Sequence, residues 1–278
     1  MSNPFQEEPS KLTVEQKPTQ QQQTQGQYQV PVEIVALPSA GQIYPVGHPL
    51  CNEQSLEIKA MTAKEEDILT SRALLKNGTL LTQLLKSCIL NKTINPDEML
   101  IGDRNAILVG IRVTGYGADY AVNVTCPACG QDFVNHFSLA GLKLKNLTVK
   151  PVQPNTNLFE FTLPSSGQVV HFKLLNGQDE TEVAKIMESK KKLGNPVEAG
   201  VTTRLFQSVV SINGESERSR VKYLVENMRA LDSRALRKYI DDIEPGVDMS
   251  QKILCSACDT QSEVVMPLGM SFFWPDIT

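Results

Sequence analysis

The sequence lacks the features that mark several large classes of protein. It has no run of about 18 apolar residues, the length that a membrane-spanning helix needs, and its first residues lack the basic start and apolar stretch of a secretory signal. We therefore expect a protein that works in a reducing cytoplasm, away from membranes. The formal net charge of −4 at pH 7 gives no overall attraction to phosphates, so nucleic acid is not expected as the main partner.

Motifs for common catalytic chemistry are also missing. The chain has no Gly-rich phosphate-binding motif with its lysine, no His-Glu-x-x-His pair, no Gly-x-Ser-x-Gly elbow and no dinucleotide fingerprint. Its 3 histidines, His48, His136 and His171, stand far apart in the sequence. With no candidate nucleophile, general base or open metal position, we predict no enzymatic activity and no catalytic residue.

Cysteine occurs in a pattern that indicates a metal site. Two Cys-x-x-Cys pairs lie between stretches with the alternation of β-strands: Cys126, Cys129, Cys255 and Cys258. Two such pairs supply the four thiolates that tetrahedral Zn²⁺ accepts. We predict that each pair forms the tip of a β-hairpin, and that the two hairpins share one structural zinc ion in a split zinc ribbon. A site closed by four sulfur ligands stabilises a fold and leaves no position for catalysis.

The spacing of the two pairs leaves alternatives open. More than a hundred residues lie between Cys129 and Cys255, so the rest of the fold must bring the pairs together. Disulfides, two unrelated reduced pairs and a ribbon that has lost its metal remain possible. His136, on the predicted strand after the first pair, could replace or supplement a thiolate. Cys88 has the spacing of a helix core position, and nothing indicates that Cys51 reacts.

The pattern along the chain divides it into four segments. Residues 1–29 are rich in Gln and poor in apolar residues, and we predict that they are disordered without a partner. Residues 30–151 form a strand and helix unit that carries the first Cys pair, and residues 152–244 form an inserted β-hairpin with a helical bundle. Residues 245–278 carry the second pair and an aromatic C-terminal segment. The predicted fold class is α+β, with small β-hairpins, helical blocks and the inserted α+β segment.

Several local signals set helix boundaries in the first half of the chain. Thr62–Glu65 has the sequence of a capping box, which starts a helix. Leu80–Ile89 is predicted as a second helix and Pro96–Leu100 as a short third. Asp103 is predicted to cap a fourth helix, which the glycines of Gly115–Gly117 end.

The C-terminal segment concentrates aromatic side chains. Phe272, Phe273 and Trp274, the only Trp of the chain, are consecutive. Exposing all three would create an apolar patch, so something is expected to cover them. The segment either packs back on the zinc ribbon or docks into a neighbouring protein, where such residues act as anchors.

Five strings of the sequence resemble, in their order, those of one viral family. They are Leu37–Pro45 (LPSAGQIYP), Met61–Thr70 (MTAKEEDILT), Gly102–Ile107 (GDRNAI), Thr114–Gly117 (TGYG) and Cys126–Gly130 (CPACG). Together they are similar to the baseplate hub assembly family of contractile-tailed phages of the T-even type. The resemblance is strong up to the strand after the first Cys pair and looser at the second pair and the aromatic end. It does not cover the Gln-rich start or much of the inserted segment.

This resemblance implies a non-enzymatic role in a viral tail, as a hub assembly chaperone or as a structural hub or baseplate component. The implied partners are other phage tail and baseplate proteins, met in the host cytoplasm during assembly or in the baseplate of the virion tail. A second interpretation is open because zinc ribbons are common in transcription machinery: a zinc-ribbon nucleic-acid-binding or transcription accessory protein. Salt-dependent DNA binding would favour that alternative, and the acidic balance of the chain weighs against it.

Overall fold

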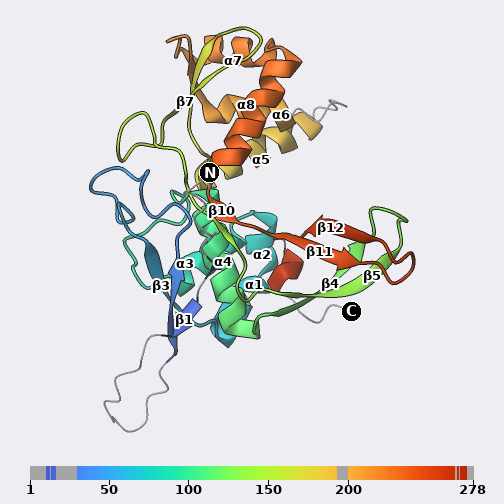
Figure 1. Ribbon diagram of the computed structural model, residues 1–278. Coiled ribbons are helices and arrows are strands. Elements are labelled where there is room, and N and C mark those ends of the chain that lie inside the picture. The colour runs from blue at the N-terminus through green and yellow to red at the C-terminus, as the bar shows by residue number, and fades with distance from the viewer. Residues whose placement is uncertain are drawn as a thin grey trace, which may run out of the picture.

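The computed structural model describes residues 11–12, 14–16, 30–192, 200–266, 268 and 270–273. Figure 1 shows a central body around the long helix α4, a lobe that lies above it, and an arm of two β-hairpins that extends to one side. The strands are short and pair antiparallel, so the protein is mixed α+β, as predicted. None of the helices in the described residues combines the length and the apolar character of a membrane span.

The body combines a three-stranded sheet, in the order β1-β2-β3, with four helices. Its elements are β1 (Val14–Gln16), β2 (Val32–Ala36), β3 (Ser55–Lys59), α1 (Ala63–Leu69), α2 (Arg72–Lys76), α3 (Leu80–Cys88) and α4 (Ile101–Tyr116). The sheet packs against α4 at Gly110, where a Cβ atom would lie 2.6 Å from the Val35 side chain. Glycine at this position therefore lets the helix approach the sheet closely.

Helix α4 forms the core of the body because it is apolar on almost every side. The residues from Ala106 to Ile111 are all buried, as expected for a helix that is hydrophobic all round. The guanidinium of Arg112 is buried as well, and it donates to the carbonyl oxygens of Phe272 (3.0 Å), Gly117 (2.9 Å) and Asp119 (3.1 Å). The helix ends at Gly117, whose φ of 82° favours glycine, and this confirms the predicted stop.

The predicted start signals of α1 and α4 have different outcomes. The capping box at Thr62 is confirmed, because the Glu65 carboxylate accepts the Thr62 backbone N–H at 3.0 Å. The short helix at Pro96–Leu100 was a wrong prediction, since this segment forms turns. The capping role of Asp103 was also wrong, because α4 already begins at Ile101. The first residue of α4 instead bonds to the lobe, since the Ile101 N–H donates to the Leu175 carbonyl at 3.2 Å.

The lobe packs helices on a second three-stranded sheet, in the order β7-β8-β9. Its elements are β7 (Phe159–Thr162), β8 (Val169–Phe172), α5 (Gly177–Lys192), α6 (Gly200–Ser208), β9 (Val209–Ile212), α7 (Arg218–Glu226) and α8 (Ala230–Ile243). Phe172 lies at its centre, with ring centroids 5.8 Å from Phe159 and 6.0 Å from Tyr239. The lobe is fixed to the body near Gly177, whose N–H donates to the Met99 carbonyl at 3.1 Å.

The arm consists of two antiparallel hairpins, and two short strands stand at its base. The hairpins are β4 (Asp119–Thr125) with β5 (Asp132–Ser138), and β11 (Ser250–Leu254) with β12 (Gln261–Val265). The base strands β6 (Leu144–Lys145) and β10 (Gly246–Val247) pair with each other. Each hairpin buries one face, which carries Tyr120 and Phe137 in the first hairpin and Ile253 in the second. Strand β6 precedes the lobe in the sequence and β10 follows it, so the lobe is inserted between two strands that lie side by side.

The predicted disorder of residues 1–29 is wrong where the structure describes this segment. Leu12 is only 4% exposed, and its N–H donates to the Leu142 carbonyl at 2.7 Å. Val14–Gln16 forms strand β1, which pairs with β2. The reason is that Leu12 and Val14, two residues apart, bring apolar side chains to an open sheet edge. The other residues of this predicted tail lie outside the described residues.

The aromatic C-terminal segment packs against the molecule at two of its three positions. Phe272 and Phe273 lie on the 3₁₀ helix η1 (Met270–Phe273) and are 0% and 1% exposed. The Phe272 ring contacts Tyr120 of β4 edge-on, at 5.1 Å between centroids. The packed-back account is confirmed for these two side chains, whereas Trp274 lies outside the described residues.

Candidate metal centre

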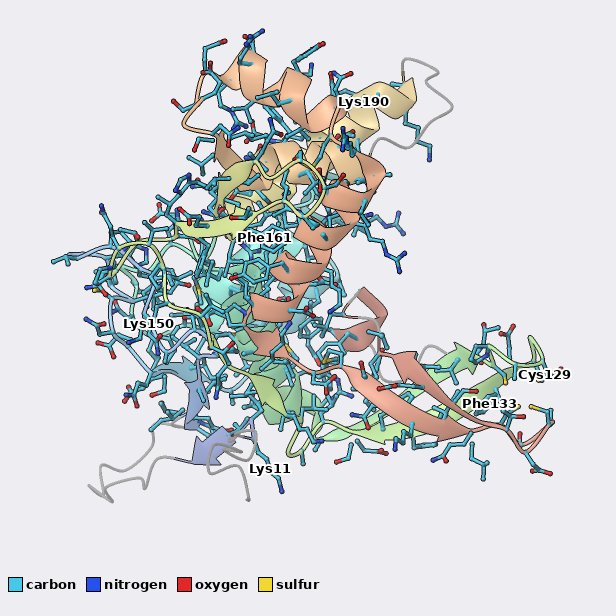
Figure 2. All side chains as sticks on the ribbon, turned by 45° about the horizontal axis from the view of Figure 1, so that its top comes forward. Lys11, Cys129, Phe133, Lys150, Phe161 and Lys190 are labelled. Atoms are coloured by element: carbon cyan, nitrogen blue, oxygen red, sulfur yellow. The ribbon has the colours of Figure 1, made fainter. Side chains whose placement is uncertain are left out.

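The two Cys-x-x-Cys pairs meet at the tip of the arm. The Sγ atoms of all four predicted cysteines lie within 4.8 Å of one another. Across the two hairpins, Cys126 Sγ is 3.9 Å from Cys258 Sγ, and Cys129 Sγ is 3.8 Å from Cys255 Sγ. Figure 2 shows Cys129 at the far end of the arm, beyond Phe133 of β5. The fold therefore brings together two pairs that are far apart in the sequence.

The two loops that carry the cysteines repeat the same hydrogen-bond pattern. In the first loop the Cys126 N–H donates to the carbonyl of residue 131 at 2.9 Å, and the Gly130 N–H donates back to Cys126 at 2.8 Å. In the second loop the Cys255 N–H donates to residue 260 at 3.1 Å, and the Asp259 N–H donates back at 2.9 Å. Gly130 (φ 76°) and Asp259 (φ 51°) occupy the same left-handed position. Both hairpins thus present their cysteines in the same way.

The four thiols have unequal surroundings. Cys126 and Cys255 are buried, Cys258 is half-buried and Cys129 is exposed. Hydrogen bonds from the Thr260 side chain and backbone lower the pKa of Cys258 to about 6, although burial opposes this shift. At neutral pH this lowered pKa favours the thiolate form of Cys258. Removing the remaining protons leaves several negative charges side by side, and a bound cation compensates for them.

The geometry fits a four-sulfur site that leaves no open position. In a tetrahedron with metal–sulfur bonds of about 2.3 Å, two sulfur atoms are separated by about 3.8 Å. The sulfur distances of 3.8 and 3.9 Å across the hairpins agree with this value. These four residues could therefore hold a metal ion.

His136 lies away from this cluster. It pairs with Ala121 in the β4–β5 ladder, toward the base of the arm, and its Nδ1 lies 3.4 Å from a carboxylate oxygen of Asp119. The alternative in which His136 replaces or supplements a thiolate finds no support, because the group of possible ligands at the tip contains the four cysteines and not His136. Cys88 is confirmed as a core thiol, since it is fully buried and burial raises its pKa to about 12. Cys51 is half-buried, and its Sγ accepts a hydrogen bond from the Asn52 amide.

Two features of the molecule were not predicted from the sequence. The first is a buried polar network in which the Asp103 carboxylate accepts the Ser39 N–H (3.0 Å), the Ser39 hydroxyl (2.6 Å) and the Tyr44 hydroxyl (2.7 Å). The second is a cleft of about 780 Å³ at the base of the arm. Residues from several distant segments line it, so no local sequence pattern could have indicated it.

Comparison with known proteins identifies a family for this chain. A family model described as T4 bacteriophage base plate protein matches residues 32–274. The chain belongs to this family. The match includes the body from β2 onward, the lobe and both Cys pairs of this base plate protein, and it confirms the baseplate part of the resemblance. The search of curated proteins and the search of solved structures returned no match. A base plate protein acts in a phage tail, and its partners are other phage proteins.

Proposed function

We propose that this base plate protein acts in the hub of the baseplate, as an assembly chaperone or as a structural component, without catalysing a reaction. The observation that carries the proposal is the family match over residues 32–274, which leaves only the chain ends unmatched. The motifs in the body resemble those of hub assembly proteins and add support. Its partners in this role are tail and baseplate proteins, met in the host cytoplasm and in the virion tail.

We further propose that the cysteine cluster binds one structural Zn²⁺. Soft thiolate ligands in a tetrahedral arrangement favour zinc over magnesium or calcium. The sulfur distances across the hairpins support this assignment. The ion would tie β4–β5 to β11–β12, and the two hairpins together would form the predicted split zinc ribbon. We also propose that the chain divides into its four segments at residues 29, 151 and 244.

One arrangement of side chains is similar to a catalytic triad. In the proposed function it is not catalytic. On the sheet of the lobe, His171 lies between Ser211, whose Oγ is 3.2 Å from Nδ1, and Glu160, which is 3.3 Å from Nε2. This order resembles a hydrolase triad. The three residues are register partners on β7, β8 and β9, so a polar ladder across the strands explains them. We expect no labelling of Ser211 by a fluorophosphonate; labelling that stops in Ser211→Ala would contradict the proposal.

Mass spectrometry of purified virions beside baseplate intermediates from infected cells tests the main proposal. A structural hub component is expected in both samples, and an assembly chaperone only in the intermediates. Absence from both would contradict a hub role. Binding to DNA that weakens steeply with salt would instead support the zinc-ribbon nucleic-acid-binding alternative.

A further inference from the structure

The arm leaves several strand edges unpaired. Its two hairpins are separate two-stranded ribbons, so within the described residues each of their strands pairs on one side only. Figure 1 shows both ribbons extending away from the body. The N–H and C=O groups of an unpaired edge can pair with another chain, and proteins usually protect such edges with charged side chains or cover them. An edge that lacks this protection therefore indicates a contact surface.

The backbone pattern shows which groups of β5 point outward. The Cys126 N–H donates to the carbonyl of residue 131 at 2.9 Å, so these two residues continue the β4–β5 ladder as a hydrogen-bonded pair. Such pairs alternate along an antiparallel ladder. The main-chain groups of Asp132, Val134 and His136 therefore point away from β4, toward the open edge.

This edge of β5 is accessible. In the part of the chain that the structure describes, no strand pairs with it and no helix runs alongside it, and the N–H and C=O of Val134 have no hydrogen-bond partner. Two surface amides, of Gln131 and Asn135, reach the carbonyl oxygens of Asp132 (3.2 Å) and His136 (3.5 Å). Each amide belongs to the residue just before its acceptor, so an incoming strand can replace it.

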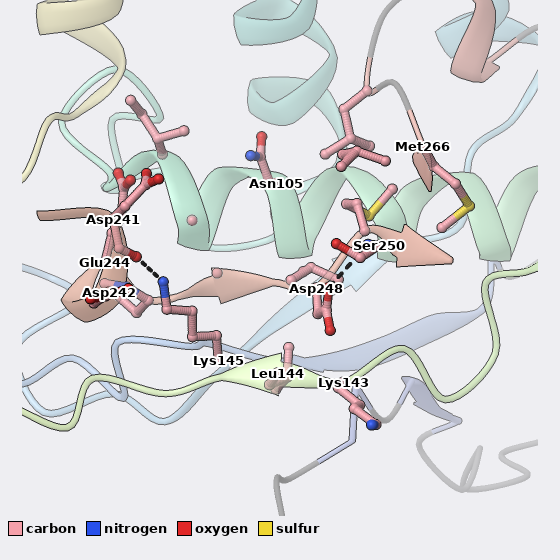
Figure 3. A pocket seen from close by; sticks show the side chains of 18 residues that line it. Asn105, Lys143, Leu144, Lys145, Asp241, Asp242, Glu244, Asp248, Ser250 and Met266 are labelled. Atoms are coloured by element: carbon pink, nitrogen blue, oxygen red, sulfur yellow. Dashed lines mark hydrogen bonds between the residues drawn. The ribbon is translucent and has the colours of Figure 1, made fainter. Parts of the chain in front are cut away.

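The edges of the second hairpin are protected. Lys252 of β11 and Glu263 of β12 lie in the middle of their strands and have outward-pointing main-chain groups. A second copy centred on either edge would set two like charges opposite each other, which destabilises the pairing. At the base, Ser250 and Met266 line the cleft beside α4 (Figure 3), so the body lies next to this end of the hairpin.

The two strands of the first hairpin differ in their contacts. The carbonyl oxygen of Asp119, at the start of β4, already accepts a hydrogen bond from Arg112 at 3.1 Å. Strand β5 contains no Lys, Arg or Glu, and its one Asp is Asp132 at the first position. Val134, near its middle, is 55% exposed. Strand β5 is thus the edge with the least protection.

The side chains along this edge are complementary to themselves. In an antiparallel pair of β5 strands centred on Val134, the two Val134 side chains lie opposite each other. Asp132 of each copy then lies opposite His136 of the other, and all these side chains project from the same exposed face. Cross-strand pairs of this kind stabilise a sheet. His136 Nδ1 lies 3.4 Å from Asp119 of its own chain, which leaves Nε2 for the second copy.

We propose that two copies of this chain associate through antiparallel pairing of their β5 strands. The pairing joins the two ribbons into one four-stranded sheet across a two-fold axis at Val134, and both copies use the same surface. A sheet of four strands is also more stable than an isolated two-stranded ribbon. The inference concerns contact between copies and does not depend on the hub role.

Sedimentation velocity of the full-length chain over a range of concentrations tests this inference. We expect a reversible dimer with a dissociation constant in the micromolar range, because a single strand pair is a small interface. Val134→Lys, which places two ammonium groups at the axis, should weaken association about tenfold or more. Asn123→Lys is the matched control: Asn123 is the register partner of Val134, but its main chain points to the opposite edge. It should leave association unchanged.

A charge exchange tests the register. His136→Glu alone and Asp132→Lys alone should each weaken association, because like charges then face each other across the axis. An equal mixture of the two variants should associate, since one copy of each brings opposite charges together at both positions. A mixture that stays as weak as its components would overturn the proposed pairing.

Hydrogen exchange identifies the edge that is used. In the dimer the Val134 amide should exchange more slowly than in dilute monomer, and the Asn123 amide should not change. A chain that stays monomeric at every concentration, or a dimer that responds equally to Val134→Lys and Asn123→Lys, would show that the inference is wrong. Protection of Val134 only when another tail protein is added would also overturn it, because the edge then binds that protein. Melting curves confirm that the variants are folded.

Discussion

Asp103 and Glu65 are both buried carboxylates, yet their surroundings shift their pKa values in opposite directions. Burial raises the pKa of Asp103, although the donors from Ser39 and Tyr44 oppose this shift. Burial also acts to raise the pKa of Glu65, but donors that include Lys59, 2.6 Å away, outweigh it and lower the pKa to about 2. The charged donor Lys59 is one difference between the two sites, since within the described residues Asp103 accepts only from neutral donors.

Glu65 gives a pH-dependent prediction. A carboxylate whose pKa falls from 4.5 to about 2 on folding stabilises the protein above pH 4.5. That contribution is about 3 kcal/mol and is lost as the pH falls through the folded pKa. Glu65→Gln should therefore reduce the free energy of unfolding by about this amount at pH 7, and the difference from wild type should shrink between pH 4.5 and pH 2. Urea titrations at several pH values measure it.

The control for this experiment is Glu53→Gln, which changes an exposed carboxyl group. It should alter the free energy of unfolding by less than about 0.5 kcal/mol at every pH. A gap between wild type and Glu65→Gln that stays constant down to pH 2 would show that the lowered pKa of Glu65 is not the cause.

Residue-level signals in the sequence succeeded where the partners are local. The capping box was predictable because Thr62 and Glu65 are three positions apart. The role of Asp103 was not, because its partners Ser39 and Tyr44 are 64 and 59 residues away in the sequence. The same sequence signal, an acid near a helix start, thus has two structural outcomes.

At the scale of elements, the arm gives a prediction about metal. The purified wild-type chain should contain about one zinc ion, and Cys258→Ser should lose metal and melt at a lower temperature. Hydrogen exchange should then speed up in both hairpins, because in the proposed site the ion would hold each against the other. Elemental analysis, melting curves and exchange measure the three effects.

Cys51→Ser is the matched control for the arm, since Cys51 lies outside the cluster. It should keep the metal and the wild-type exchange rates. A folded, reduced wild-type sample with almost no zinc would refute the metal assignment, and faster exchange in only one hairpin would refute the coupling.

The strand β1 gives a second prediction at this scale. Leu12 is 4% exposed beside this strand, so Leu12→Ala should lower the free energy of unfolding by about 2 to 3 kcal/mol. Val46→Ala, which trims a side chain that is 83% exposed, should change it by less than about 0.5 kcal/mol. Urea unfolding measures both; equal effects would mean that the N-terminal segment does not stabilise the fold.

Elements were predictable from the sequence where their pattern is strong and continuous. The helix at Leu80–Ile89 and both Cys hairpins follow from spacing alone. Strand β1 could not be predicted in this way, because the composition averaged over residues 1–29 hides two apolar residues among many polar ones. Its stability comes from the edge of β2, which no local pattern in that segment reveals.

At the scale of the whole molecule, Gly102 controls how the end of the lobe meets the body. A Cβ atom at Gly102 would lie 1.7 Å from the carbonyl oxygen of Pro245, which is backbone and cannot move aside cheaply. Gly102→Ala should therefore cost about 2 kcal/mol or more of unfolding free energy, by overpacking. Differential scanning calorimetry or urea titration measures the loss.

Gly115→Ala, on the same helix, is the control for Gly102→Ala. Its added methyl group would meet the flexible end of the Met61 side chain at 2.6 Å, and alanine favours a helix over glycine by about 1 kcal/mol. We expect little loss at Gly115. A Gly102→Ala protein as stable as Gly115→Ala would show that the close approach to Pro245 is not required.

The arrangement of the parts could not be predicted from the sequence. The cleft draws its walls from α4, β6, the end of α8 and β12, and these segments meet only because β6 pairs with β10. Spacing between Cys pairs indicated that the two hairpins meet at their tips, but it carried no information about their bases. The sequence thus indicated the cysteine cluster and not the cleft.

The pairing of β6 with β10 also bears on how relatives of this protein can diverge. Lys145 and Gly246 are register partners, so the chain leaves for the lobe and returns from it at adjacent points. Paired residues of an antiparallel ladder have Cα atoms about 5 Å apart, a gap that a short turn can bridge. The lobe can therefore be exchanged as a cassette, by recombination or by design, for any domain whose ends lie close together, while the sulfur cluster and the body keep their own connections.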